Sequence, residues 1–354
     1  MSTLFRIEML PAREGDCLLV TYGPPARPHR VLVDLGRAAT YKAFRERVAT
    51  LSAEARDFEL LIVTHIDRDH IEGTLRLLED TDRPVRFRDV WFNGYHHLQD
   101  TELETFGAVQ GERLTEGLRQ SGWAWNRAFQ GRAARIGEAG APPSIGLPGD
   151  LTLHLLSPDR DQLSALEPTW KQECARAGIV AGAAGAPDGP TGFERLGSID
   201  FDALADAPFH EDPSKPNGSS IAVLAELDGR RALLAADAHP GRLAESLRHF
   251  ADPGSGRVRL DAFKLPHHGS QNNLSRELLD LVDCPRYLVS TNSAYFHHPD
   301  AETIARLIKY GGRPTIHFNY RSPETALWDD PDWRERHGYE TVYPERDGYL
   351  ALTL

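Results

Sequence analysis

Four side chains that can bind a metal ion fall within six positions of one segment. They are His65, Asp67, Asp69 and His70, in the run His-Ile-Asp-Arg-Asp-His. The apolar run before them, residues 58–63, predicts a buried strand, and the leucines after them predict a helix. A strand-to-helix turn in an α/β sheet lets several side chains converge on one point. Because imidazole and carboxylate ligands suit zinc or manganese, the segment favours a metal site over a solvated acidic turn.

Three other segments place candidate ligands directly after an apolar run. Asp34 follows one such run, Asp237 follows another, and the pair His267 and His268 follows a third. Each segment alone is weak evidence, because every strand ends in a polar loop. Their occurrence in one chain, together with the first cluster, is much stronger evidence for a shared site.

The composition is that of an ordinary globular protein, with 354 residues of which 40% are hydrophobic and 26% are charged. The formal net charge of −12 disfavours a surface that binds polyanions, because affinity for phosphates depends largely on Lys and Arg. It does not exclude chemistry on a phosphodiester, since bound divalent ions supply local positive charge.

Features of the sequence favour a cytoplasmic protein without a membrane span. No apolar run approaches the roughly 20 residues needed to cross a bilayer, and the N-terminal segment lacks the features of a secretory signal. The cysteines Cys17, Cys174 and Cys284 are odd in number and widely spaced, which fits reduced thiols better than disulfides.

The chain reads as strands with interspersed helices, which predicts the α/β class in a single domain over residues 1–354. Two stretches in the middle, residues 137–149 and 177–192, are rich in Gly, Ala and Pro. We therefore expect an insertion or a lid around residues 137–216.

The motifs, in their order along the chain, resemble those of the metallo-β-lactamase-fold hydrolases. That family has His-x-His-x-Asp-His after a strand, then a distant His, a bridging Asp and a final His. Here Asp67 stands in place of the second His, and Asn217 in place of the distant one. The resemblance implies a four-layer αβ/βα sandwich, with mixed sheets inside and helices outside.

The two departures from the family pattern resemble the soluble metallo-β-lactamase-like domain of the bacterial DNA-uptake channel ComEC. The matching segments are Gly15-Asp16, Asp34-Leu35-Gly36, His65 to His70, Asp237, Pro266 to Ser270, and His298-Pro299. The matches span residues 14 to 299 and so cover most of the chain. Because the membrane segments of the channel are missing, we expect a free-standing relative.

The resemblance implies one or two divalent ions per chain. The implied ligands are His65, Asp67, Asp69, His70, Asp237 and His267. Asp237 would bridge an ion at Asp69 and His70 to a second ion in a site richer in oxygen. The family pattern favours His267 over His268 as the final ligand, and spacing alone leaves open both this choice and a contribution from Asn217.

Such a centre supports hydrolysis of a phosphodiester, with nucleic acid or a nucleotide as the substrate class. A hydroxide held by divalent ions is a nucleophile at neutral pH. Asp69 would orient the water or take its proton, and Lys264, His268 and His298 are candidates for contacting the substrate or protonating the leaving group.

Two alternatives remain open from the sequence. The same centre could hydrolyse a carboxylic ester, a thioester or a related bond, because the fold alone does not determine the substrate. The protein could also be a non-catalytic binding or regulatory module with a degenerate metal site, for which Asp67 and Asn217 are the best support.

Overall fold

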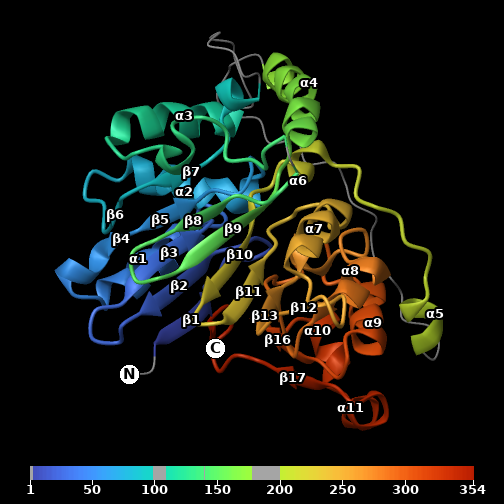
Figure 1. The fold of residues 1–354 in the computed structure, drawn as a ribbon. Helices are drawn as coiled ribbons and strands as arrows, with labels where there is room; N and C mark the ends of the chain where they lie inside the picture. Colours follow the sequence, from blue (N-terminus) through green and yellow to red (C-terminus); the bar gives the residue numbers. More distant parts are fainter. Residues whose placement is uncertain (1–2, 99–108, 139, 178–199) are drawn as a thin grey trace.

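Two β-sheets pack face to face in the middle of the protein, and helices cover their outer faces (Figure 1). This computed structural model describes residues 3–98, 109–138, 140–177 and 200–354. One hydrophobic core lies between the sheets, and one further core lies between each sheet and its helices. The expected four-layer α/β sandwich of mixed sheets with outer helices is therefore confirmed.

The first sheet has six strands, with antiparallel pairs on one side and parallel pairs on the other. In spatial order they are β18 (Leu350–Thr353), β1 (Leu4–Met9), β2 (Leu18–Gly23), β3 (His29–Val33), β5 (Leu60–Ile62) and β7 (Val90–Trp91). Val20 and Val31 face the second sheet, whereas Leu19 and Leu32 face the helices. Both faces are buried, which explains why these strands lack an alternation of apolar and polar residues.

The second sheet has eight strands and is also mixed. In spatial order they are β17 (Glu340–Val342), β16 (Thr315–Phe318), β15 (Arg286–Val289), β13 (Ala262–Lys264), β11 (Arg230–Leu234), β10 (Ala222–Leu227), β9 (Thr152–Ser157) and β8 (Ser144–Gly146). The turn Asp228-Gly229 joins β10 to β11, and both of its residues have positive φ. This is the two-residue hairpin turn that an Asp-Gly sequence predicts.

The helices bury their apolar faces against the sheet on their own side. The first sheet is covered by α1 (Thr40–Ala49), α2 (Arg68–Glu79), α3 (Val109–Ser121) and α4 (Arg160–Ala177). The second is covered by α5 (Phe201–Ala205), α7 (Pro240–Leu247), α8 (Arg276–Leu281) and α9 (Ala301–Tyr310). The shorter elements are α6 (Lys215–Gly218), α10 (Pro323–Ala326), α11 (Pro331–His337) and the strand pairs β4 (Asp57–Phe58) with β6 (Arg86–Phe87) and β12 (Val258–Arg259) with β14 (Val282–Asp283).

Part of the region expected to form an insertion contributes to the sandwich. Strands β8 and β9 extend the second sheet, and Leu153 and Leu155 of β9 lie in the core between the sheets. Residues 178–199 lie outside the described part of the chain, so a lid there stays a prediction. Among the helices of the described ranges, none has the length and apolar character needed to cross a lipid bilayer.

One edge of the sandwich collects the residues that the sequence singled out. Strands β3 and β5 are parallel, as are β11, β13 and β15, so the carboxyl ends of each set lie together. At this edge the backbone N–H of Ile221, just before β10, donates to the carbonyl oxygen of Thr64, just after β5, at 2.9 Å. The loops that follow these strands can therefore bring side chains from both sheets to one point.

Candidate metal centre

The turn between β5 and α2 carries the first ligands. His65 and Asp67 lie in this connection, and Asp69 and His70 lie in the first turn of α2. Asp67 occupies the N-cap position without capping the helix, and its Oδ2 lies 3.6 Å from Nε2 of His65. A carboxylate such as Asp69 is also favourable at a helix N-terminus, where the helix dipole is positive.

Two glycines let neighbouring loops approach α2 closely. A Cβ atom added to Gly15 would lie 1.8 Å from the carbonyl oxygen of Asp69, and one added to Gly73 would lie 1.9 Å from that of Leu35. Neither separation leaves room for a side chain. These contacts press the start of α2 against the loops after β1 and β3, and so fix the position of Asp69.

The ligands from the second sheet follow sharp turns of the backbone. Ala236, just before Asp237, has φ of 49°, and His267 and His268 have φ of 44° and 55°. A left-handed backbone costs a non-glycine residue about 1–2 kcal/mol, and such strain is typical of functional sites. Here the turns redirect the chain directly after β11 and β13, toward the first sheet.

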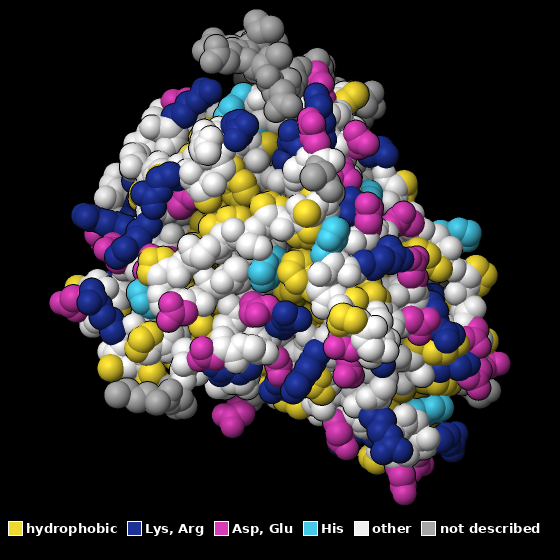
Figure 2. Space-filling model, viewed as in Figure 1, with side chains coloured by type: hydrophobic (Ala, Val, Ile, Leu, Met, Phe, Trp, Pro, Cys, Tyr) yellow, Lys and Arg dark blue, Asp and Glu magenta, His cyan; other side chains and the backbone are white. Residues whose placement is uncertain are grey.

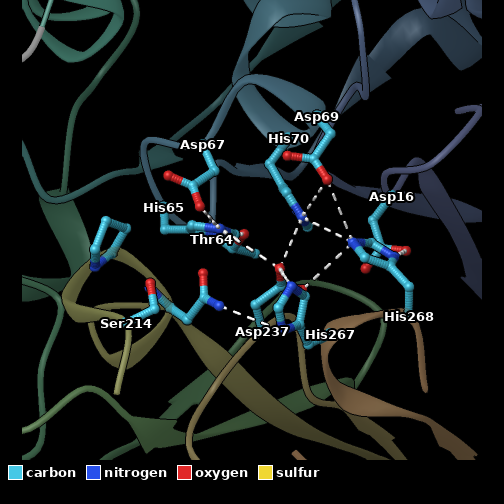
Figure 3. A network of polar contacts seen from close by, with 12 residues as sticks. Asp16, Thr64, His65, Asp67, Asp69, His70, Ser214, Asp237, His267 and His268 are labelled. Atoms are coloured by element: carbon cyan, nitrogen blue, oxygen red, sulfur yellow. Dashed lines mark hydrogen bonds and ion pairs between the residues drawn. The ribbon is translucent and has the colours of Figure 1, made fainter. Parts of the chain in front are cut away.

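Three side chains lie together on one side of Asp237, and we call them the deep group: Asp69, His70 and His268. Nε2 of His70 lies 3.3 Å from Nε2 of His268 and 3.8 Å from Oδ2 of Asp69, and Nε2 of His268 lies 3.5 Å from the same oxygen. Asp237 closes the group, with Oδ2 3.3 Å from His70 and Oδ1 3.7 Å from His268 (Figure 3).

On the other side of Asp237 lies the outer group, which comprises His65, Asp67 and His267. Nε2 of His65 is 3.7 Å from Oδ2 of Asp237, and Nε2 of His267 is 3.9 Å from it. Figure 3 shows Asp237 between the two groups, with His65 and Asp67 on one side and His268 on the other. Asp237 thus lies where the sequence predicts a bridging carboxylate.

Asp34 sets the tautomers of two histidines. Its Oδ2 accepts hydrogen bonds of 2.7 Å from Nδ1 of His70 and from the hydroxyl of Thr64. That hydroxyl accepts in turn from Nδ1 of His65 at 3.0 Å. Because both Nδ1 atoms carry the proton, both Nε2 atoms present a lone pair to the cluster.

The cluster fits a divalent ion. Nδ1 of His268 donates to the carbonyl oxygen of Ser290 at 2.9 Å, so the Nε2 lone pairs of His70 and His268 face each other. Only a proton or a cation between them relieves their repulsion. Tetrahedral bonds of about 2.0–2.2 Å place ligand atoms about 3.3–3.6 Å apart, close to the deep-group separations. Nε2 of His65 and Oδ1 of Asp237 are buried without a hydrogen-bond partner among the described residues.

The electrostatics favour ionised carboxylates in the cluster. Burial acts to raise the pKa of Asp69, but His70 and His268 outweigh it and hold that pKa below its ordinary value. Burial also acts to raise the pKa of Asp237, but the surrounding histidines outweigh it and hold that pKa well below its ordinary value. Conversely, the pKa of His70 is raised against the effect of burial, chiefly by Asp237 and Asp34. Without an ion, protonated imidazoles would form ion pairs with these carboxylates.

The adjacent histidines His267 and His268 lie on different sides of Asp237. His268, expected to contact the substrate, lies within the deep group, whereas His267, expected to complete that group, lies outside it. Nδ1 of His267 is instead 3.0 Å from Oδ1 of Asn273 and 3.5 Å from Oδ2 of Asp212. The two side chains diverge because consecutive residues in a left-handed turn point in different directions.

Lys264 and His298 also differ from expectation. Lys264 is fully buried and its ammonium donates to Asp16 at 2.8 Å, so it does not reach a substrate from solvent. His298 stacks on Phe296 beside the outer group, and its Nδ1 lies 3.3 Å from Oδ1 of Asp300. Burial lowers the pKa of His298 despite Asp300. A neutral imidazole is a poor proton donor, so the geometry supports a positioning contact better than leaving-group protonation.

Two features near the outer group had no clear signal in the sequence. Asp212 accepts hydrogen bonds from the side-chain amides of Asn217 at 2.6 Å and Asn273 at 3.1 Å, while the amide oxygen of Asn217 is buried without a partner among the described residues. Tyr295 and Phe296 are among the few exposed large hydrophobic residues of the described ranges. Neither Asp212 nor this aromatic pair follows an apolar run, which was the pattern that marked the ligands.

No protein-family model matches the chain. The chain is similar to ComE operon protein 3 of Bacillus subtilis (strain 168), with 21% identity over an alignment of 373 positions. The alignment covers 98% of this chain but 35% of that protein, so the chain spans about a third of its relative. Among solved structures, the metallo-β-lactamase fold protein YhfI from Bacillus subtilis aligns over the full length of both chains, at 9% identity and a TM-score of 0.42.

The structural likeness to YhfI is too distant to carry an argument. The fold assignment depends instead on the two mixed sheets with outer helices, and the convergence of His and Asp residues at one edge agrees with it. With the near full-length alignment to ComE operon protein 3, these features confirm that the chain resembles the metallo-β-lactamase-fold hydrolases of the ComEC type.

Proposed function

We propose that this protein is a metal-dependent hydrolase that cleaves phosphodiester bonds in a nucleic acid or a nucleotide. The observation that carries the proposal is the pair of ligand groups on either side of Asp237, one deep and one outer. Two adjacent divalent ions are typical of enzymes that displace a group at phosphorus. Loops of both sheets bring five of these residues together: His65, Asp69, His70, Asp237 and His268. This convergence supports a hydrolase better than a binding module with a degenerate metal site.

In this proposal Asp69, His70 and His268 hold one ion, and His65 and Asp67 hold the second, with Asp237 shared between them. Divalent ions bound there lower the pKa of a water molecule and polarise a phosphoryl oxygen. The ion at Asp69, His70 and His268 would have two imidazole ligands, which suits zinc, whereas the ion at His65 and Asp67 would have one, which suits manganese.

The other residues near the ions position the substrate and move protons. Asp69, whose side chain is partly accessible, accepts a proton from the attacking water. His267 lies at the outer rim, where Asp237 and Asp212 more than offset burial and raise its pKa to about 9. A protonated imidazole at this place can donate to the leaving oxygen, the role first considered for its neighbour His268.

The surface supports a substrate that is small or bound locally. Figure 2 shows acidic and basic side chains interspersed over one face of the protein, without a broad basic patch. Because the protein has a net charge of −12, its surface as a whole adds little electrostatic affinity for long duplex DNA. A cytoplasmic location, inferred from the cysteines, stays part of the proposal; Cys17 and Cys284 are buried free thiols.

Metal content and turnover test the proposal together. Elemental analysis of protein purified without chelator, after supplementation with zinc or manganese, should give one to two ions per chain. An Asp69→Ala, His268→Ala variant should lose them, and chelator should abolish hydrolysis of bis(p-nitrophenyl) phosphate by the wild type. The absence of bound metal after supplementation would overturn the proposal in favour of a binding module.

A further inference from the structure

A cavity of about 340 Å³ lies beside the metal centre, at the same edge of the sandwich. Its walls come from four separate segments: the loop after β1, the start of α1, the loop after β16, and the turn before β18. β1 ends where β18 begins, and the parallel strands β15 and β16 both end at this edge. The volume falls within the range of about 300–1,000 Å³ that small-molecule sites occupy.

Three basic side chains line the cavity: Arg13, Lys42 and Arg346. None of the three forms an ion pair of 4.0 Å or less with any residue in the described ranges. The carboxylates Glu46 and Asp347 also line the cavity, so its basic groups outnumber its acidic groups by one. In a protein with a net charge of −12, a cavity with unpaired basic groups is a local exception that suits an anionic ligand.

The rest of the lining suits a nucleotide better than a bare anion. Tyr320 and Tyr349 contribute aromatic rings, and Arg346 lies over the ring of Tyr349 at 4.4 Å. Aromatic rings stack on nucleobases, and arginine and lysine bind phosphate oxygens. The two carboxylates can accept hydrogen bonds from sugar hydroxyls or base amino groups. Thr40, another lining residue, has a buried hydroxyl without a hydrogen-bond partner among the described residues.

One short segment separates the cavity from the metal centre. Arg13 lines the cavity, Gly15 packs on the backbone of Asp69, and Asp16 lies among the ligand atoms of Asp237 and His268. Three residues span at most about 11 Å between Cα atoms. The cavity and the metal centre can therefore contact adjacent parts of one substrate.

We propose that this cavity binds one nucleotide of a single-stranded nucleic acid whose scissile phosphodiester lies at the metal centre. Arg13, Lys42 and Arg346 contact its phosphate, and the tyrosines contact its base. This inference rests on the proposed function for the identity of the substrate. It adds a second binding site that acts on substrate affinity and not on the chemical step.

The binding test uses chelator, so that the metal centre contributes neither turnover nor metal-mediated affinity. Anisotropy of a labelled octathymidylate is compared between the wild type, a Lys42→Ala, Arg346→Ala variant, and an Arg27→Ala, Arg259→Ala variant. The control pair removes the same charge from exposed positions that make no ion pair with described residues, at the opposite ends of the strands.

The cavity variant should bind the strand at least tenfold more weakly, and the control should stay within twofold of the wild type. Loss of the contacts to this one phosphate should also reduce the slope of log affinity against log salt by up to about 0.7, the value for one neutralised phosphate of a single strand. Equal losses in both variants, or no loss in either, would overturn the proposal. If adenosine 5′-monophosphate binds the cavity as tightly as the strand, the ligand is a free nucleotide and the strand assignment is wrong.

A turnover test separates this proposal from the proposed function. Hydrolysis of bis(p-nitrophenyl) phosphate, which is too small to reach the cavity, should have the same kcat in the wild type and in the cavity variant. A loss of that turnover in the variant would show that the cavity is not a separate site. If the wild type itself hydrolyses nothing, the proposed function fails, while the strand-binding measurement still decides whether the cavity binds nucleic acid.

Discussion

The deep and outer groups share Asp237 but differ in burial and in support. In the deep group the side chains of His70 and His268 are 0% and 1% exposed, and that of Asp69 is 14% exposed. In the outer group His65 is also 0% exposed, but Asp67 and His267 are 38% and 20% exposed. Asp34 and the Ser290 carbonyl hold the deep histidines directly. Asp67, in contrast, has a single partner in the cluster, His65 at 3.6 Å.

This difference indicates that the two groups have different tasks. A rigid group with preset lone pairs loses little conformational entropy when it binds an ion, so it binds tightly. The second ion would have one imidazole ligand, the buried His65, and the exposed carboxylate of Asp67, so we expect it to bind more weakly and to leave room for substrate oxygen atoms. We therefore expect the deep group to determine whether the protein is active and the outer group to determine how active it is.

The largest effect on turnover is expected for one of the two adjacent histidines, His268. His268→Ala should lower turnover of bis(p-nitrophenyl) phosphate about a thousandfold or more, because it removes a ligand worth several kcal/mol to the transition state. His267→Ala should lower it less than about tenfold, since nitrophenolate leaves without a proton, but should slow oligonucleotide cleavage about a hundredfold. The reverse pattern would return His267 to the ligand position that the sequence favoured.

Much of the fold and several residues of the candidate site could be predicted from the sequence. Buried strands give long apolar runs, and Asp69 and His70 stand close together on one helical turn, so local pattern was enough to find them. The choice between His267 and His268 was not accessible, because it depends on the left-handed turn after β13. Asp212 and the cavity were missed because their partners come from distant segments that carry no repeating pattern.

Opposite pH dependences of stability should appear with and without metal. In the metal-free protein the pKa of His267 is about 9, above the unfolded value of about 6.5, because Asp237 and Asp212 offset burial. Its stabilising contribution is complete below pH 6.5 and is lost as the pH rises through 9. The loss is at most about 3 kcal/mol, since the side chain is partly exposed.

With metal bound the slope should reverse, because ligands must be deprotonated and binding strengthens as the pH rises. Urea unfolding at pH 6.5 and pH 9, in chelator and in saturating manganese, measures both slopes. A His267→Gln variant should flatten the slope in chelator. Slopes of the same sign in both conditions would show that the cluster is not the ion-binding site.

Asp34→Asn should weaken metal binding about 10- to 100-fold, the usual cost of removing a carboxylate that orients a ligand. The amide loses the negative charge that faces Nδ1 of His70, and its NH2 group would face the backbone N–H of Thr64, which donates to Oδ1 of Asp34 at 2.8 Å. Thr64→Val is the matched comparison, because it removes the hydroxyl that links Asp34 to His65 but leaves the bond between Asp34 and His70, so it should weaken mainly the ion of the outer group. Calorimetric titration with zinc and manganese would measure the affinity for each ion in both variants. Equal losses of affinity in the two variants would show that the deep and outer groups do not bind their ions independently.

The smallest effect is expected for Asp67→Ala, the most exposed of the proposed ligands. Turnover should fall about tenfold in dilute manganese and recover as manganese is raised, because mass action compensates for a weaker site. Elemental analysis at low metal should give close to one ion per chain in place of two, with the deep group still occupied. A loss as large as that of His268→Ala, without recovery, would mean that both ions are equally necessary. In that case the exposure of Asp67 reflects access for substrate, not weak binding, and the outer group would share the task assigned to the deep one.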